Sequence, residues 1–126
     1  MRVGIDIVEI NQVKRIKNLE RFLDRFFALE ELRYIRVKAK KEQTIAGIFA
    51  GKEAFLKALE IGIGKIPLKK VVIGHKENCA PYLVMNEEVT KILTEYGYSS
   101  ADISISHGGD YSVAMCSLVP INKRKK

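Results

Sequence analysis

The spacing of apolar and polar residues predicts one strand followed by two helices at the start of the chain. Residues 1–9 are rich in Val and Ile and alternate around Asp6, which is typical of a strand. Apolar residues then recur at helical spacing through residues 12–27, with Asn11 as the expected N-cap. Residues 28–40 have the composition and spacing of a second, shorter helix.

A longer helix follows, and it carries charged residues within an apolar stripe. We expect it to begin at Thr44 and to end at the glycine- and proline-containing segment 62–67. Lys52 falls on the same face as Phe55 and Leu59. We therefore expect the stem of Lys52 to be buried and its ammonium to emerge at an edge of the core.

The second half of the chain alternates between strand and helix signals. Two strands joined by a turn, a helix capped by Asn86, and a hairpin are predicted at residues 68–75, 81–85, 86–97, 101–107 and 111–119. The order of elements implies an α+β fold, in which a mainly antiparallel sheet packs against the long helix. We expect one domain over residues 1–119 and a basic, disordered tail over residues 120–126.

Composition narrows the class of protein. A chain of 126 residues that is 47% hydrophobic suits a single core. Cys79 and Cys116 lie far apart and form no CxxC pair, which favours a reduced, cytoplasmic protein without a disulfide framework or zinc site. No apolar run reaches about 18 residues, so no membrane span is predicted. Because residues 1–9 already have the pattern of a strand, we expect no signal peptide.

The net charge of +7 favours acidic partners. Nucleic acid, an acidic protein and a phosphate-rich small molecule all meet this condition, and charge alone does not choose among them. The sequence has neither a GxxxxGK[ST] nor a GxGxxG phosphate-binding loop.

Two carboxylates and one lysine are the first candidates for chemistry. Asp6 lies among Val and Ile, and burying a carboxylate costs free energy unless it is paired or binds a cation. Asp6 therefore either faces solvent on its strand or holds a cation. Glu53 and Lys57 form either an ordinary i,i+4 surface pair or a site for metal and phosphate. Asp6 with Glu53 would suit Mg²⁺, which takes one or two carboxylates and completes its shell with water and substrate phosphates.

The two histidines differ in their surroundings. His107 ends a predicted strand and precedes Gly108 and Gly109, where backbone can approach a ligand closely. His107 is therefore either a ligand-binding residue or a hairpin residue without a role. His75 ends a strand in the same way, and we assign it no role.

Three segments in this order resemble the holo-acyl-carrier-protein synthase family of small phosphopantetheinyl transferases: GIDIVEI at residues 4–10, FAGKEAFLKAL at residues 49–59, and SISH at residues 104–107. The resemblance covers nearly the whole chain. It implies the 4'-phosphopantetheinyl transferase fold and transfer of 4'-phosphopantetheine from coenzyme A to a serine of apo acyl carrier protein. Holo carrier protein and adenosine 3',5'-bisphosphate would be the products, in support of fatty acid synthesis.

The resemblance also implies roles for individual residues. Asp6 and Glu53 match the Mg²⁺ ligands of the family and, with Lys57, form the expected catalytic group. Lys57 also matches the lysine associated with the phosphates of coenzyme A. Family members are homotrimers with active sites between subunits. The coenzyme A-binding set is therefore expected to draw on two chains, and it comprises Lys57, Gly62, Gly64 and His107. The group that takes the serine proton is either Glu53 acting through a water or a metal-bound hydroxide.

The same resemblance suggests a role for a basic helix face, because acyl carrier proteins are acidic. Lys14, Arg15, Arg21 and Arg25 are expected either to dock the carrier or to form an ordinary solvated face.

The chain departs from the usual family pattern at four positions: Gln12, Ile48, Glu60 and Gly108. Gln12 and Ile48 stand where many members have arginine, and Gly108 stands where threonine is frequent. These changes affect nucleotide and carrier contacts and leave the carboxylates and Lys57 in place, so we expect an active enzyme.

Two other interpretations remain open at this stage. A small RNA-binding protein would explain the basic charge, although the sequence lacks an RNP-like aromatic strand and a GxxG clamp, so no nucleic-acid partner is expected. An inactive family member that serves in assembly would explain the departures.

Overall fold

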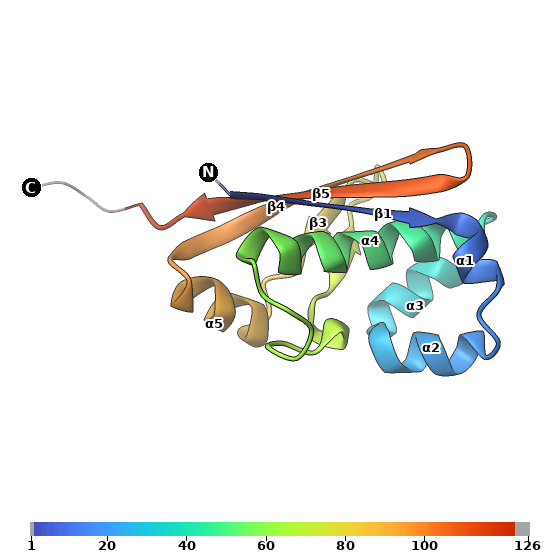
Figure 1. Cartoon of the computed structure of the whole chain (residues 1–126), viewed down its shortest axis with the longest axis horizontal. Helices are drawn as coiled ribbons and strands as arrows, with labels where there is room; N and C mark the ends of the chain where they lie inside the picture. The colour runs from blue at the N-terminus through green and yellow to red at the C-terminus, as the bar shows by residue number, and fades with distance from the viewer. Residues whose placement is uncertain (1, 123–126) are drawn as a thin grey trace, which may run out of the picture.

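The computed structural model describes residues 2–122 and consists of two antiparallel sheets and five α-helices (Figure 1). The larger sheet has the strand order β1-β5-β4, and the smaller one pairs β2 with β3. The strands are β1 (Arg2–Glu9), β2 (Ile73–His75), β3 (Pro81–Leu83), β4 (Tyr98–Gly108) and β5 (Tyr111–Pro120). The helices are α1 (Ile10–Lys14), α2 (Leu19–Phe26), α3 (Leu29–Arg36), α4 (Lys41–Leu59) and α5 (Glu87–Glu95). The predicted α+β class, with a mainly antiparallel sheet against a long helix, is confirmed.

The helix predicted over residues 12–27 is wrong in one respect, because two helices occupy this stretch. The chain leaves helical geometry between Arg15 and Asn18. The side chain of Asn18 accepts a hydrogen bond from the backbone N–H of Arg21 at 3.1 Å and caps α2. A side-chain oxygen that can satisfy a free N–H favours a helix start at this point. The predicted N-cap, Asn11, lies inside α1.

The long helix begins about one turn before the predicted Thr44. Its N-cap is Lys40, whose carbonyl accepts from the backbone N–H of Thr44 at 3.1 Å and from the Thr44 hydroxyl at 3.0 Å. At the other end, Glu60 adopts a left-handed conformation with φ of 58°. This conformation ends the helix before Gly62, and α4 is 19 residues long.

One face of the larger sheet packs on α4, and Figure 1 shows β1 running along the upper side of this helix. Alternate residues of β1 point toward α4, and Gly4 makes the closest approach: a Cβ there would lie 2.1 Å from the Ala54 carbonyl oxygen. Only glycine permits this separation. The same alternation turns the side chain of Asp6, two residues further on, toward α4. Asp6 therefore lies on the covered face of the sheet and not on the solvent face.

The core surrounds α4 and contains an ion pair that the sequence did not reveal. Lys52 is fully buried, and its ammonium lies 2.7 Å from Oε1 of Glu31, which is fully buried on α3. It also donates to the carbonyls of Leu68 and Val71 at 2.9 and 2.7 Å. The expectation that the ammonium of Lys52 emerges at an edge is wrong, because Glu31 and two carbonyls satisfy it inside the protein.

These contacts also explain why the predicted strand over residues 68–75 is shorter. Leu68–Lys70 form a 3₁₀ turn, and only Ile73–His75 pair with β3. The Leu68 carbonyl accepts from both Lys52 and the backbone N–H of Val71, so this stretch is bonded as a turn instead of as part of a sheet.

The last strand, β5, continues through Pro120, one residue beyond the predicted end of the domain at residue 119, and the division into domain and tail stays a prediction. Residues 123–126, which hold most of the predicted tail, lie outside the described residues. None of the helices in the described range is long and apolar enough to span a bilayer.

Candidate active site

Asp6, Glu53 and Lys57 come together where β1 crosses α4, and we call these three residues the carboxylate site. The ammonium of Lys57 lies 2.7 Å from Oδ1 of Asp6. Lys57 and Glu53 are one helical turn apart on α4, and Glu53 is half-buried. Among the described residues, Lys57 forms its ion pair with Asp6. The surface i,i+4 pair of Glu53 with Lys57, which the sequence allowed, is therefore not the main contact of Lys57.

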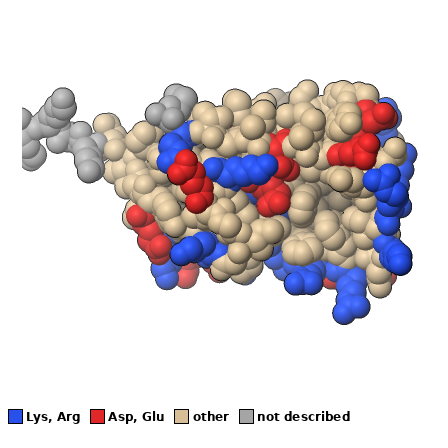
Figure 2. Space-filling model, viewed as in Figure 1, with Lys and Arg blue, Asp and Glu red and all other residues tan. Residues whose placement is uncertain are grey.

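The charges of Asp6 and Lys57 act on the carboxyl group of Glu53. Burial raises the pKa of Glu53, the charge of Asp6 raises it further, and Lys57 lowers it. The hydrogen bond to Asp6, followed by the charge of Asp6 and more weakly that of Glu53, raises the pKa of Lys57. Figure 2 shows acidic and basic side chains meeting in the middle of this face of the molecule. Because the charge of Asp6 disfavours the ionised form of Glu53, with one cation already beside them, this is a site that a further cation would stabilise.

The donor set fits a magnesium ion better than a transition metal. Within residues 2–122, no group of three or more His, Cys, Asp or Glu side chains could hold a metal ion by itself. Mg²⁺ binds through one or two carboxylates and keeps positions for water and substrate phosphates. Asp6 and Glu53 meet that requirement, whereas zinc would demand more protein ligands.

The loop after α4 lies next to Lys57 in the chain and carries Gly62 and Gly64. Both glycines are exposed, and Gly64 has a φ of 117° that other residues rarely adopt. Neither position has an atom within 4 Å of where a Cβ would lie, so the backbone here is open to an approaching ligand.

His107 lies on the opposite flank of α4 from the carboxylate site. It is on β4, and β5 separates that strand from β1. A Cβ on Gly47 would lie 2.7 Å from Cε1 of His107, and Gly47 is about 120° around α4 from Glu53. Within one chain, the structure therefore brings Asp6, Glu53 and Lys57 together and leaves His107 apart.

The side chain of His107 is held by Ser112. Its Nδ1 lies 2.6 Å from the Ser112 hydroxyl, which is also 3.3 Å from the Gln43 carbonyl oxygen. This contact fixes the orientation of the ring. Partial burial lowers the pKa of His107, which favours the neutral ring.

A cavity of about 220 Å³ opens beside His107, and we call it the imidazole cavity. Gly47 and Ile48 of α4 line it, so the unusual Ile48 borders this space although it is 1% exposed. His75, to which the sequence gave no role, lines it too and stacks on Tyr34 with 3.7 Å between ring centroids and 4° between planes. Sequence reasoning missed His75 and Tyr34 because they meet only through the packing of β2 against α3.

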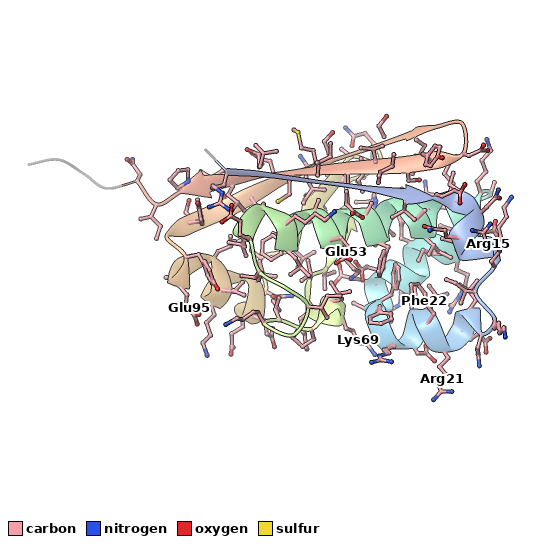
Figure 3. The ribbon with its side chains drawn as sticks, in the orientation of Figure 1. Arg15, Arg21, Phe22, Glu53, Lys69 and Glu95 are labelled. Atoms are coloured by element: carbon pink, nitrogen blue, oxygen red, sulfur yellow. The ribbon has the colours of Figure 1, made fainter. Side chains whose placement is uncertain are left out.

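The four residues expected to dock a carrier protein lie at the end of the molecule formed by α1 and α2, and we call them the basic face. Lys14 ends α1, Arg15 caps it, and Arg21 and Arg25 are exposed on α2. Arg21 projects away from the body of the protein (Figure 3). Arg15 is partly neutralised by Glu9 at 3.5 Å.

A family profile described as the 4'-phosphopantetheinyl transferase superfamily matches residues 2–116. That match covers nearly the whole domain, including all three residues of the carboxylate site. The chain belongs to this superfamily of transferases.

Relatives with curated names assign the chain to a narrower group within this superfamily. Holo-[acyl-carrier-protein] synthase from Finegoldia magna is 39% identical over 119 residues, which cover 94% of this chain and 96% of the relative. The protein of the same name from Clostridium acetobutylicum is 37% identical over 113 residues, covering 89% and 91% of the two chains. Within the superfamily, the chain belongs to the holo-[acyl-carrier-protein] synthases, so the predicted family is confirmed.

Solved structures agree in fold. The holo-[acyl-carrier-protein] synthase of Neisseria meningitidis has a TM-score of 0.85 and 31% identity, covering 93% of this chain and 96% of the other. The Helicobacter pylori enzyme, solved in complex with coenzyme A, has a TM-score of 0.80 and 31% identity, covering 92% and 98%. The interpretation as a small RNA-binding protein is set aside, because the chain belongs to a family of enzymes.

Proposed function

We propose that this protein transfers the 4'-phosphopantetheine group from coenzyme A to a serine of apo acyl carrier protein. The observation that carries the proposal is the carboxylate site, in which Lys57 and Asp6 are 2.7 Å apart beside the half-buried Glu53. This combination suits a substrate with several negative charges on one pyrophosphate. Membership of the holo-[acyl-carrier-protein] synthases supports the same reaction.

The reaction joins the serine oxygen to the phosphorus that carries pantetheine. The bond from that phosphorus to the bridging oxygen breaks, and adenosine 3',5'-bisphosphate leaves with that oxygen. The serine proton passes to a nearby base or to solvent. Lys57 is placed to offset charge that moves onto the departing phosphate. Gly62 and Gly64 follow Lys57 in the chain, and their open backbone would let the phosphates approach closely.

Asp6 and Glu53 are the residues that would hold Mg²⁺. When bound, the ion supplies charge neutralisation at the pyrophosphate and orients its oxygens. The raised pKa of Glu53 supports this assignment, because a cation between the two carboxylates would remove the repulsion that contributes to it. Glu53 is also a candidate base through a water, and the alternative of a metal-bound hydroxide stays open.

A trimer with active sites between subunits would bring His107 to the carboxylate site of a neighbouring subunit. The separation of these groups on opposite flanks of α4 supports this arrangement, as each chain then contributes half of a site. The face of the larger sheet that points away from α4 supports it too. It exposes apolar side chains that an isolated subunit would leave in water: Val3, Ile5, Ile7, Met115 and Val119.

The test of the proposed function is mass spectrometry of an apo acyl carrier protein incubated with this protein, coenzyme A and Mg²⁺. We expect the carrier to gain the mass of one phosphopantetheine arm and expect no gain when Mg²⁺ is chelated. If several carriers, including the one from the same organism, all fail to gain mass, the proposal is wrong.

Replacing Gly47 with alanine is expected to weaken coenzyme A binding by displacing His107. The new Cβ would lie 2.7 Å from the imidazole and 3.0 Å from the Ile105 side chain, so the ring must move. If the ring moves, it should lose its hydrogen bond to a charged group of coenzyme A. Loss of one such bond predicts a rise in KM for coenzyme A of about tenfold or more, with little change in kcat. Gly51→Ala is the matched control on the same helix, since its Cβ would meet Ile73 at an ordinary 3.4 Å. Equal kinetics in the two variants would contradict a role for His107.

Reversing the charge of Arg21 and Arg25 to glutamate is expected to raise KM for the carrier protein by about tenfold and to leave KM for coenzyme A unchanged. The reason is that the basic face would attract the acidic carrier and lies away from the imidazole cavity. The effect should shrink as salt is added. A variant with Lys70→Glu and Lys91→Glu changes the net charge equally on other elements and serves as control. An equal effect on both substrates would show that the basic face does not dock the carrier.

A further inference from the structure

The two cysteines of the chain have opposite surroundings. Cys116 lies inside the core, where burial and the charge of Asp102 raise the pKa of its thiol to about 12. Cys79 is exposed in the turn between β2 and β3. Because a thiol reacts through its thiolate, Cys116 is inert at neutral pH and Cys79 is the cysteine that a reagent in solution can attack.

The turn between β2 and β3 holds the backbone of Cys79 in a fixed position. The backbone N–H of Cys79 donates to the Lys76 carbonyl at 2.8 Å, and the backbone N–H of Lys76 donates to the Ala80 carbonyl at 2.9 Å. Cys79 has a φ of 70°, in the left-handed region that favours glycine. These constraints set the direction in which the thiol projects.

Lys38, which lies two residues after the end of α3, contacts this thiol. Its ammonium is 3.3 Å from Sγ of Cys79 and 4.6 Å from the centre of the Tyr34 ring. Cys79 and Tyr34 both line the imidazole cavity, so the lysine and the thiol meet at the rim of this cavity. The ion pairs found within residues 2–122 involve other lysines and arginines, so no carboxylate competes with the thiol for Lys38.

The contact with Lys38 makes the thiol more reactive. The hydrogen bond from Lys38, followed by the one with Tyr34, lowers the pKa of Cys79. A lower pKa raises the fraction of thiolate at neutral pH, and the thiolate is the form that reacts with peroxides.

The wall of the same cavity offers a partner to a small polar molecule. Nδ1 of His75 is buried and has no hydrogen-bond partner among the described residues. Burial and, more weakly, the charge of Lys38 lower the pKa of His75 to about 4, so its ring is neutral at pH 7. Hydrogen peroxide can both donate and accept a hydrogen bond, so it matches Nδ1 in either tautomer of the ring. His75 and Cys79 line one cavity of about 220 Å³, which is ample for a molecule of this size.

We propose that hydrogen peroxide oxidises Cys79 and that the oxidised sulfur then forms a covalent bond to the side-chain nitrogen of Lys38. In the first step the thiolate attacks one oxygen of the peroxide, the O–O bond breaks, and hydroxide leaves, which gives a sulfenic acid. The hydroxide takes a proton from the Lys38 ammonium. The amine then attacks the sulfur, the S–O bond breaks, and the departing hydroxide takes a second proton from the nitrogen. One thiolate, one ammonium and one peroxide thus give a sulfenamide and two waters, with the sulfur oxidised and the peroxide reduced by two electrons.

The position of Lys38 favours this product over the alternatives. A sulfenic acid condenses with a nearby thiol or nitrogen. The other thiol of the chain, Cys116, is buried in the core, whereas the nitrogen of Lys38 is already in contact with the sulfur. The new bond would link the end of α3 to the turn between β2 and β3 across the rim of the imidazole cavity. It uses no residue of the carboxylate site and does not depend on the proposed function.

The experiment treats the wild type with a small excess of hydrogen peroxide and measures the masses of the intact protein and of its proteolytic peptides. We expect the protein to lose two hydrogens, and we expect the change to lie in a cross-linked pair of peptides that contain Lys38 and Cys79. A thiol reductant should restore the original mass. The proposal is wrong if the mass does not change, if Cys79 only gains oxygen, or if the two hydrogens are lost through a disulfide.

Three variants identify the residues that take part. Lys38→Met removes the nitrogen, so no cross-link should form, and Cys79 should react about fivefold more slowly because its thiolate has lost a cation. Lys76→Met is the matched control, since Lys76 is exposed in the same turn and carries the same charge, and it should form the cross-link at the wild-type rate. Cys79→Ser should lose no hydrogens. An equal loss of hydrogens in Lys38→Met and the wild type would overturn the proposal.

Discussion

Glu53→Gln is expected to lower kcat for carrier-protein modification by about a thousandfold, because it removes one of the two carboxylates that would hold Mg²⁺. Stabilisation of moving charge by a bound metal is worth several kcal/mol, and each 1.36 kcal/mol corresponds to a factor of ten in rate. The measurement is turnover of apo carrier protein at saturating coenzyme A over a range of Mg²⁺ concentrations. Glu42→Gln, in the first turn of the same helix, is the matched control and should behave as wild type.

The same variant should not lose stability, which separates a lost catalytic group from a damaged fold. Glu53 has a raised pKa in the folded protein, so its ionised form disfavours folding at neutral pH. Glutamine removes that cost, and without Mg²⁺ the Tm of Glu53→Gln should equal or exceed that of the wild type. The difference should shrink as the pH falls through the raised pKa and should vanish below the ordinary glutamate pKa of 4.5, where the wild-type side chain is protonated in both states. A variant that is inactive because it has unfolded would refute the assignment.

Lys52→Met is expected to lower the free energy of unfolding by about 3–5 kcal/mol, since it leaves the buried carboxylate of Glu31 without its cation. It also frees the carbonyls of Leu68 and Val71 from their shared donor. Burial already raises the pKa of Glu31, and the charge of Lys52 is the largest opposing effect. Urea unfolding at pH 7 would measure the loss.

The pH dependence and a double variant distinguish an unpaired charge from a packing defect. In Lys52→Met the pKa of Glu31 should rise further, so the penalty should be present above that pKa and should diminish as the pH falls toward 4.5. Glu31→Gln combined with Lys52→Met should recover much of the loss. The glutamine oxygen can still accept the backbone N–H of Ile73, which donates to Glu31 at 2.8 Å. Equal losses in the single and double variants at all pH values would show that packing is the cause.

The buried pair also connects the parts of the enzyme that we propose to bind its substrates. Lys52 fixes α4, which carries Glu53 and Lys57, to the segment that follows the glycine loop. Glu31 fixes α3 and β2, whose Tyr34 and His75 form the wall of the imidazole cavity. One ion pair thus fixes the elements on both flanks of α4 relative to this helix.

Much of the fold could be read from the apolar pattern, because each element buries one face and repeats at its own period. The strand at β1, the hairpin of β4 and β5, and the Asn86 cap of α5 are found where the pattern predicted them. Predictions failed where a side chain competes with the backbone. Asn18 starts a new helix, and Lys52 takes carbonyls from a predicted strand.

The sequence by itself determined the order of the elements, the family and the residues of the carboxylate site, because these depend on local spacing and on motifs within short segments. Only the tertiary structure decided that Lys57 pairs with Asp6, that Lys52 is buried against Glu31, and that Lys38 reaches the imidazole cavity. Each of these contacts joins residues at least 21 positions apart. The partner of a charged side chain at such separations depends on which faces of strand and helix meet, and the period of a single segment does not contain that information.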